Sequence, residues 1–219
     1  MPRQRRARKR NNNKGAMGYM DRASKGLFLA SKAFTIAKGL KNVINSEKKT
    51  YDVEIINSTQ GTTGSIVELT GMAQGDDYNG RDGRSILLKS LEVKGVMVRN
   101  TSSTSTIIRI ILFKDNNADG SNPTALELLT TDSNNSLRNA APHNMKRFHI
   151  YVDKVYMLDA AKSNLAKFDF YKELNHHVKY ASSAASTSNE GSLWCYLVSN
   201  DGINSPSITL RSRVRYYDN

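Results

Sequence analysis

Residues 146–158 read KRFHIYVDKVYML, and apolar and polar side chains alternate along them. Alternation with a period of two places successive side chains on opposite faces of a strand. One face of this strand would carry Phe148, Ile150, Val152, Tyr156 and Leu158. The other would carry Arg147, His149 and Asp153. The stretch therefore predicts a half-buried antiparallel β-strand.

Short apolar segments separated by polar turns continue on both sides of this stretch. They predict eight strands at 51–57, 65–69, 86–99, 106–114, 147–158, 165–174, 192–199 and 207–217. A composition rich in Ser, Thr and Asn favours strands and turns over helices. No repeat of 20 to 50 residues is visible, which argues against a solenoid or propeller fold. We expect an all-β sandwich.

Two strands are apolar on both faces. Residues 107–113 are interrupted only by Arg109, and in residues 193–198 both alternating sets are apolar or aromatic. Such strands are covered on both sides, either by the opposing sheet or by a neighbour. The long connection 116–146 contains a short helical segment at 124–129.

Positive charge is concentrated at the beginning of the chain. Residues 1–50 hold 14 Lys and Arg against Asp21 and Glu47, a net charge of +12, whereas residues 51–219 hold 18 basic and 18 acidic residues. A neutral domain with a cationic extension is suited to holding a polyanion. We divide the chain into a basic arm (1–15), a basic amphipathic helix (16–48) and a sandwich domain (49–219).

The arm lacks the apolar residues needed to offset its ordering entropy, so we expect it to be disordered when free. Its basic residues would bind phosphates, serve as a nuclear localisation signal, or do both. They are Arg3, Arg5, Arg6, Arg8, Lys9, Arg10 and Lys14.

Residues 16–44 show a helical period, with an apolar stripe formed by Leu29, Ala33, Ile36, Leu40 and Val43. Three roles fit this helix. It could lie beneath a shell and touch nucleic acid, act on membranes, or dock on its own domain. In the first role, its nucleic-acid-binding residues would include Arg22, Lys25 and Lys32.

Several function classes find no support in the sequence. No apolar run reaches the ~18 residues that span a bilayer, and the Arg-rich start is unlike a signal peptide. Cys195 is the sole cysteine, so no intrachain disulfide can form, and a reducing site of synthesis is expected. No metalloprotease, P-loop or GxSxG motif is present, and we expect no enzymatic activity.

Several ordered motifs resemble one family. Residues 72–84 read MAQGDDYNGRDGR, residues 108–119 read IRIILFKDNNAD, and PTALELL and KRFHIYVDKVYML follow. This order resembles coat proteins of the satellite tobacco necrosis virus type, and also those of small circular single-stranded DNA viruses. The resemblance covers roughly residues 45–175 and fades toward the C-terminus.

The resemblance implies an eight-stranded viral jelly roll, a T=1 icosahedral shell of sixty copies, and an arm that faces inward onto packaged single-stranded nucleic acid. It also implies calcium at subunit contacts, with ligands near Glu47, Asp76, Asp82 and Asp218. Turn capping and salt bridges between subunits are the alternative roles for these carboxylates. No cofactor is otherwise required.

The Arg-rich arm favours DNA over RNA, because single-stranded DNA viruses replicate in nuclei and would use host import factors. The QGDD segment also suits an RNA satellite, which would assemble in the cytoplasm. In either case the protein would be found in the virion, and no membrane partner is expected. Arg211, Arg213 and Arg215 share one strand face, which either lines the inner wall or is solvated or subunit-contacting.

A rival class is a cellular protein that binds single-stranded nucleic acid with a β-sandwich or OB-like domain. Such a protein should carry basic and aromatic residues on its folded domain. Here that domain is neutral, which favours the coat protein.

Overall fold

The computed structural model describes residue 32 and residues 48–117, 120–182 and 187–218. The chain divides into two compact units, Met1–Asn45 and Ser46–Asn219. All the strands described lie in the second unit. They are β1 (Lys48–Thr59), β2 (Ser65–Glu68), β3 (Ser85–Val98), β4 (Ser105–Asp115), β5 (Phe148–Asp159), β6 (Leu165–Lys179), β7 (Ser192–Ser199) and β8 (Ser207–Asp218).

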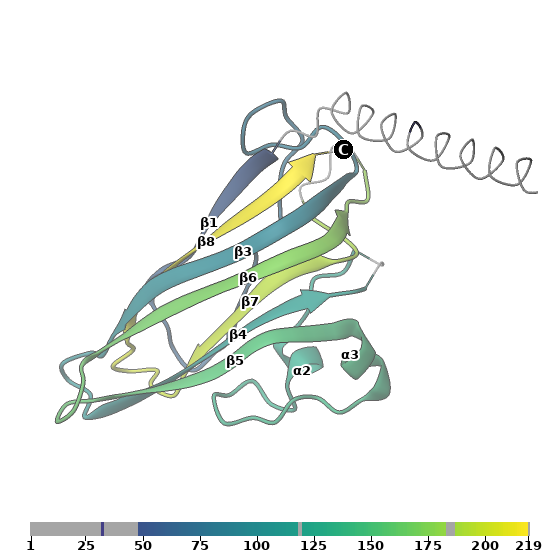
Figure 1. Ribbon diagram of the computed structural model, residues 1–219. Coiled ribbons are helices and arrows are strands. Elements are labelled where there is room, and N and C mark those ends of the chain that lie inside the picture. The colour runs from purple at the N-terminus through teal and green to yellow at the C-terminus, as the bar shows by residue number, and fades with distance from the viewer. Residues whose placement is uncertain (1–31, 33–47, 118–119, 183–186, 219) are drawn as a thin grey trace, which may run out of the picture. The chain divides into compact units, whose positions relative to one another are not determined.

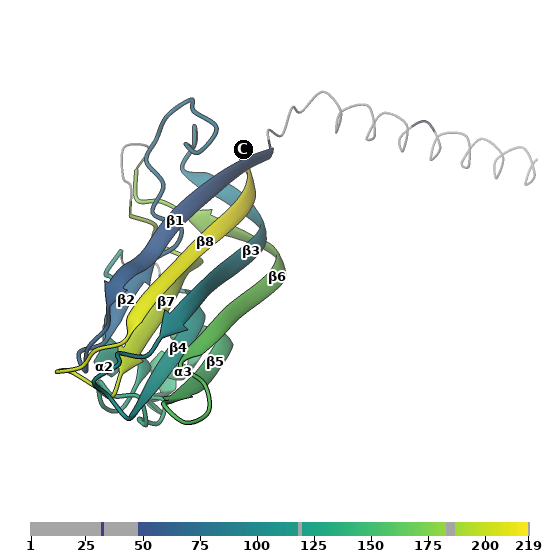
Figure 2. The same ribbon diagram turned by 90° about the vertical axis from the view of Figure 1, so that its left-hand side faces the viewer.

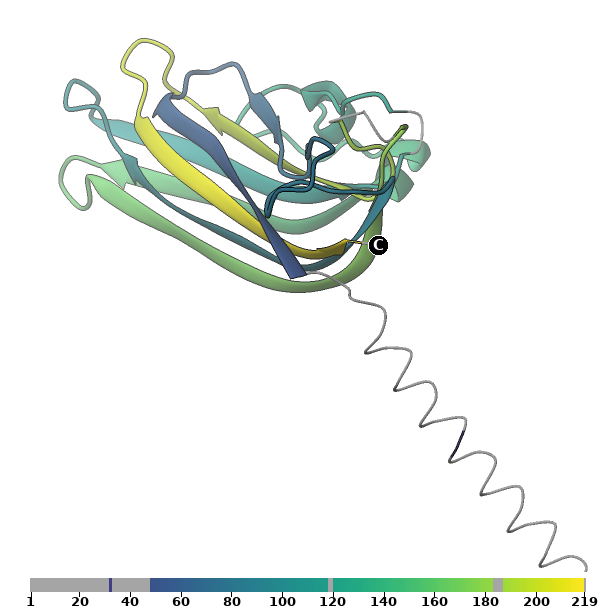
Figure 3. The ribbon, with the colours of Figure 1, turned by 90° about the horizontal axis from the view of Figure 1, so that it is seen from above.

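The strands form two antiparallel sheets of four strands, seen as separate layers in Figure 3. Sheet A has the order β1-β8-β3-β6 and sheet B the order β2-β7-β4-β5 (Figures 1 and 2). The first strand thus pairs with the last, and consecutive strands mostly alternate between sheets. This order is that of a jelly roll, in which two Greek keys interleave. The predicted eight-stranded all-β sandwich is confirmed.

Alternate side chains of the two sheets meet in a central core. In β8, Leu210 and Val214 are fully buried, whereas Arg211 and Arg213 between and beside them are exposed. The alternation fixes which face of each strand meets the opposing sheet. Fully buried residues of the core include Leu88, Val93, Ile110, Leu112, Leu193, Leu197, Leu210 and Val214.

The outward face of sheet B carries a second apolar cluster. Ile111, Phe113, Trp194, Tyr196 and Val198 form it together with Leu128 and Leu129. The last two come from the β4–β5 connection, which contains α2 (Ala125–Leu128) and α3 (Pro142–Arg147) (Figure 1). The strands predicted to be covered on both faces are confirmed, and the outer cover is this connection.

One expectation about β5 is wrong. Phe148 and Ile150 belong with the outer cluster, whereas Val152, Tyr156 and Leu158 pack at the central core. The pairing of β4 with β5 shifts between Leu112 and Phe113, where Phe113 faces Ile150 and Leu112 faces Val152. A β-bulge of this kind moves the following side chains to the other face.

Candidate nucleic-acid interface and carboxylate cluster

Most of the predicted nucleic-acid-binding residues lie outside the described residues. This holds for Arg3, Arg5, Arg6, Arg8, Lys9, Arg10, Lys14, Arg22 and Lys25. Lys32 is described, and it is helical and solvent-exposed. The arm at 1–15 and the helix at 16–48 therefore stay predictions. No helix in the described part of the chain is long and apolar enough to cross a membrane.

Two of the four predicted calcium ligands lie together. The Lys49 ammonium is 3.3 Å from Asp218 Oδ2 and 3.8 Å from Asp82 Oδ1. The backbone N–H of Asp82 also donates to Asp218 Oδ2, at 2.7 Å. The side chains of Lys49 and Asp218 are only 1% and 4% exposed. This carboxylate cluster thus already contains a buried positive charge.

No described contact places the third predicted ligand, Asp76, in this cluster, and the fourth, Glu47, is not described. Asp76 is exposed on the β2–β3 loop. Calcium takes six to eight oxygen ligands. Among the residues described, no three His, Cys, Asp or Glu side chains are arranged to hold a metal ion. The described part of the cluster thus contains an ion pair, and calcium binding there stays a prediction.

The β2–β3 loop, which holds the QGDD motif, is organised by a fully buried arginine. Arg81 Nε donates to the carbonyl of Met72 at 3.1 Å, and its guanidinium also donates to the carbonyls of Gly83 and Ser182. The guanidinium carbon lies 3.7 Å from the centroid of the Tyr180 ring. The sequence analysis did not identify this role of Arg81.

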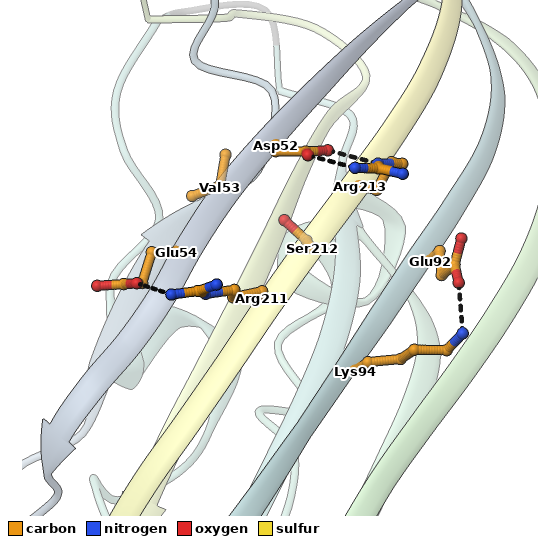
Figure 4. A pocket seen from close by; sticks show the side chains of 8 residues that line it. All are labelled: Asp52, Val53, Glu54, Glu92, Lys94, Arg211, Ser212 and Arg213. Carbon is orange, nitrogen blue, oxygen red and sulfur yellow. Dashed lines mark hydrogen bonds and ion pairs between the residues drawn. The ribbon is translucent and has the colours of Figure 1, made fainter.

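The three arginines of β8 lie on the outward face of sheet A, and each has an acidic partner. Figure 4 shows the pairs of Arg211 and Arg213. Arg211 pairs with Glu54 at 2.9 Å, Arg213 with Asp52 at 2.8 and 2.7 Å, and Arg215 with Glu92 at 3.0 Å. Lys94 also pairs with Glu92, at 2.7 Å. The arginines of β8 therefore form ion pairs with acidic residues of the two neighbouring strands, β1 and β3.

These contacts lower the pKa of two carboxyl groups. The hydrogen bond from Arg213 lowers the pKa of Asp52. Hydrogen bonds from Lys94 and then Arg215 lower the pKa of Glu92. Both carboxyl groups therefore stay ionised at pH values below the ordinary carboxyl pKa of about 4.

Burial shifts the pKa of the cysteine and of one histidine in the domain. Cys195 is fully buried in β7, which raises the pKa of its thiol to about 12 and keeps it protonated. Burial lowers the pKa of His176, which lies 3.1 Å from the carbonyl of Gly191. A protonated, buried thiol is a poor nucleophile.

Comparisons with known proteins agree with the coat-protein resemblance. The family model described as satellite tobacco necrosis virus coat protein matches residues 26–219. The capsid protein of Satellite tobacco necrosis virus 1 is 35% identical over 121 residues, which cover 53% of this chain and 60% of that protein. The coat protein of Satellite tobacco necrosis virus 2 is 30% identical over 131 residues, covering 58% and 64%.

A third relative is the coat protein of Maize white line mosaic Satellite virus, 25% identical over 177 residues, which cover 78% of this chain and 81% of that protein. Among solved structures, Desmodium yellow mottle tymovirus is similar with a TM-score of 0.41 and 13% identity, covering 78% of this chain and 87% of that chain. The match to the family model extends over the whole sandwich and part of the preceding basic segment. This chain belongs to the satellite tobacco necrosis virus coat protein family.

Proposed function

We propose that this chain closes with copies of itself into a T=1 icosahedral shell and packages single-stranded nucleic acid through its basic N-terminal segment. The distribution of charge carries the proposal. Residues 1–50 have a net charge of +12 and residues 51–219 have none. The sandwich is thus free of the mutual repulsion that would oppose self-association, and the preceding segment supplies the cations.

Binding by the arm would rest on counterion release. Each Lys or Arg that approaches a phosphate frees a condensed cation, which gives sequence-independent affinity that falls steeply with salt. Sixty copies would bring roughly 720 excess positive charges, enough to neutralise much of a genome on the order of a thousand nucleotides. Nucleic acid would therefore act as the counterion for assembly.

The relatives do not support the preference for DNA. They are coat proteins of satellite viruses, the case for which the sequence allowed an RNA genome. The predictions of nuclear assembly and of host import factors assumed a DNA genome. The relatives therefore do not support these predictions either. Location in the virion, with a structural role, follows from the family.

Expression of the full chain alone, followed by electron microscopy and sedimentation, tests the proposal. We expect uniform particles of ~17 to 20 nm, the size that follows from sixty subunits at ordinary protein density. They should contain nuclease-protected host nucleic acid, and digestion with RNase or DNase after extraction identifies its type. Soluble monomers at high concentration, with nucleic acid present, would refute the shell.

A further inference from the structure

Two of the clefts on the outward face of sheet A differ in charge. A cleft of about 480 Å³, the paired-charge cleft, is drawn in Figure 4. Its charged lining is balanced between Asp52, Glu54 and Glu92 and the basic residues Lys94, Arg211 and Arg213. A cleft of about 500 Å³, the basic cleft, is lined by Lys48, Lys89, Arg215 and Glu173, together with Ser90, Tyr171, Leu174 and Asn175. Its lining thus has three cations against one carboxylate.

A β-bulge gives the basic cleft its shape. The pairing of β3 with both neighbours shifts between Leu88 and Ser90: Lys89 is the extra residue against β8, whereas two residues of β6, Leu174 and Asn175, stand against it. Bulges redirect side chains in this way. The Lys89 ammonium lies 5.6 Å from the centroid of the Tyr217 ring and 3.2 Å from Asn175 Oδ1. The cation is therefore held at the wall of the cleft.

The basic cleft also has an exposed aromatic ring. Tyr171 of β6 is 56% exposed, whereas Tyr180 and Tyr216 are almost fully buried. The residue opposite Tyr171 on β3 is Glu92, whose carboxylate is held by Arg215 and Lys94. An exposed tyrosine beside fixed cations contributes nothing evident to folding. It does match the sequence-tolerant stacking platforms of proteins that bind single strands.

The position of the basic cleft connects it with the arm. Lys48 lines the cleft and is also the first residue of β1, so the basic segment joins the domain at this cleft. The volume lies within the range of small-molecule sites, ~300 to 1,000 Å³.

We propose that the basic cleft is a second nucleic-acid site, in which Tyr171 stacks on a base of the packaged strand while Lys48 and Lys89 contact the adjoining phosphates. This proposal rests on the proposed packaging function and adds a site on the folded domain. Because stacking and phosphate contacts read no base edge, the site should accept any single-stranded sequence. The paired-charge cleft should bind no strand.

Photocrosslinking of full-chain particles, with their own nucleic acid inside, tests the proposal. Irradiated particles are digested, and nucleotide-bearing peptides are identified by mass spectrometry. We expect a crosslink in the peptide that contains Tyr171. The yield of crosslinked β6 peptide should fall by about fivefold or more in the double variant Lys48→Glu/Lys89→Glu, and the Tyr171 crosslink should disappear in Tyr171→Ala.

Two matched controls separate the cleft from general effects. Tyr78→Ala removes a tyrosine that is 75% exposed on the β2–β3 loop. Lys146→Glu/Lys162→Glu makes the same charge change at exposed positions in α3 and in the β5–β6 turn. Neither control should reduce the β6 crosslink. If the double variant fails to assemble, Tyr171→Ala supplies the comparison.

The outcomes separate the two proposals. Crosslinks confined to peptides from residues 1–47, in particles with normal cargo, would overturn the basic cleft and leave the packaging function standing. A Tyr171→Ala variant that weakens assembly, with wild-type particles giving no β6 crosslink, would show a contact between copies and also overturn it. Particles that never contain nucleic acid would overturn both proposals.

Discussion

Two buried cations, Lys49 and Arg81, connect the β2–β3 loop to the rest of the sandwich. Lys49 joins the start of β1 to Asp82 of the loop and to Asp218 at the end of β8. Arg81 bonds across the loop and stacks on Tyr180. Removing one partner of a buried ion pair destabilises a protein by more than the intact pair stabilises it, because the remaining charge is buried without that partner.

We predict that Lys49→Met lowers the melting temperature by roughly 10 °C, since it leaves the Asp218 carboxylate buried without its cation. Thermal unfolding followed by circular dichroism measures the change. Lys48→Met, at the exposed neighbouring position, is the control and should shift the melting temperature by less than about 2 °C. Equal shifts in the two variants would show that the buried ion pair does not stabilise the domain.

The pair of Asp52 and Arg213 predicts a dependence on pH. Because Arg213 lowers the folded-state pKa of Asp52, the pair stabilises the domain above the ordinary carboxyl pKa of about 4 and loses this effect as the pH falls through the folded value. Asp52→Asn should therefore cost less than about 1 kcal/mol at pH 7, since both side chains are about half exposed. The cost should shrink as the pH falls through the folded-state pKa of Asp52.

Urea unfolding of wild type and Asp52→Asn across this pH range measures the difference. Burial raises the pKa of Glu68, which acts in the opposite direction, but it is common to both proteins and cancels. A difference that stays constant as the pH is lowered into the range of acid unfolding would show that the Asp52 charge is not its source.

At the scale of the element, the β4–β5 connection acts as a lid over the outward face of sheet B. A capping box of Thr124 and Glu127 starts α2, and Arg147 at the end of α3 bonds to both Glu127 and Asp115. Leu128 and Leu129 are thereby held in the outer cluster. The connection thus covers Phe113 and Trp194 and shields them from solvent.

Leu129→Ala should destabilise the domain by about 2 to 5 kcal/mol, because Leu129 is fully buried and its truncation leaves a cavity. Leu126→Ala, whose side chain is 62% exposed, should change stability by less than about 0.5 kcal/mol. Chemical unfolding measures both. A small effect at Leu129 would mean that the connection unfolds separately from the sandwich.

The eight strands could be predicted from turn residues combined with one of two patterns: alternation where one face is buried, or a continuous apolar run where both faces are buried, as in β4 and β7. The bulge at β5 could not, since it depends on pairing with β4, a contact between distant segments. The helix α3 was missed because its residues are polar, although Pro142 at its start is a helix signal.

The candidate site was less predictable than the fold. The basic segment stands out by charge alone, but the basic cleft combines Lys48, Lys89, Tyr171 and Arg215 from four strands. Only the strand order of sheet A brings them together. Similarly, the burial of Arg81 has no sequence signal, because arginine is ordinarily exposed.

At the scale of the whole molecule, the proposed function divides two tasks between two parts of the chain. The charge-neutral jelly roll would associate with copies of itself, and the basic segment would hold the phosphates. Residues 1–15 contain seven of the 14 basic residues found in residues 1–50. Their removal should therefore weaken packaging without altering the sandwich.

The nucleic acid content of particles formed by a variant without residues 1–15, compared with that of full-chain particles, tests this division most directly. The absorbance ratio at 260 and 280 nm, followed by extraction, measures the cargo in gradient-purified particles. We predict that the shortened chain keeps its β-sheet circular dichroism and still assembles, but that its particles contain much less nucleic acid. Undiminished cargo in these particles would contradict the role of the arm.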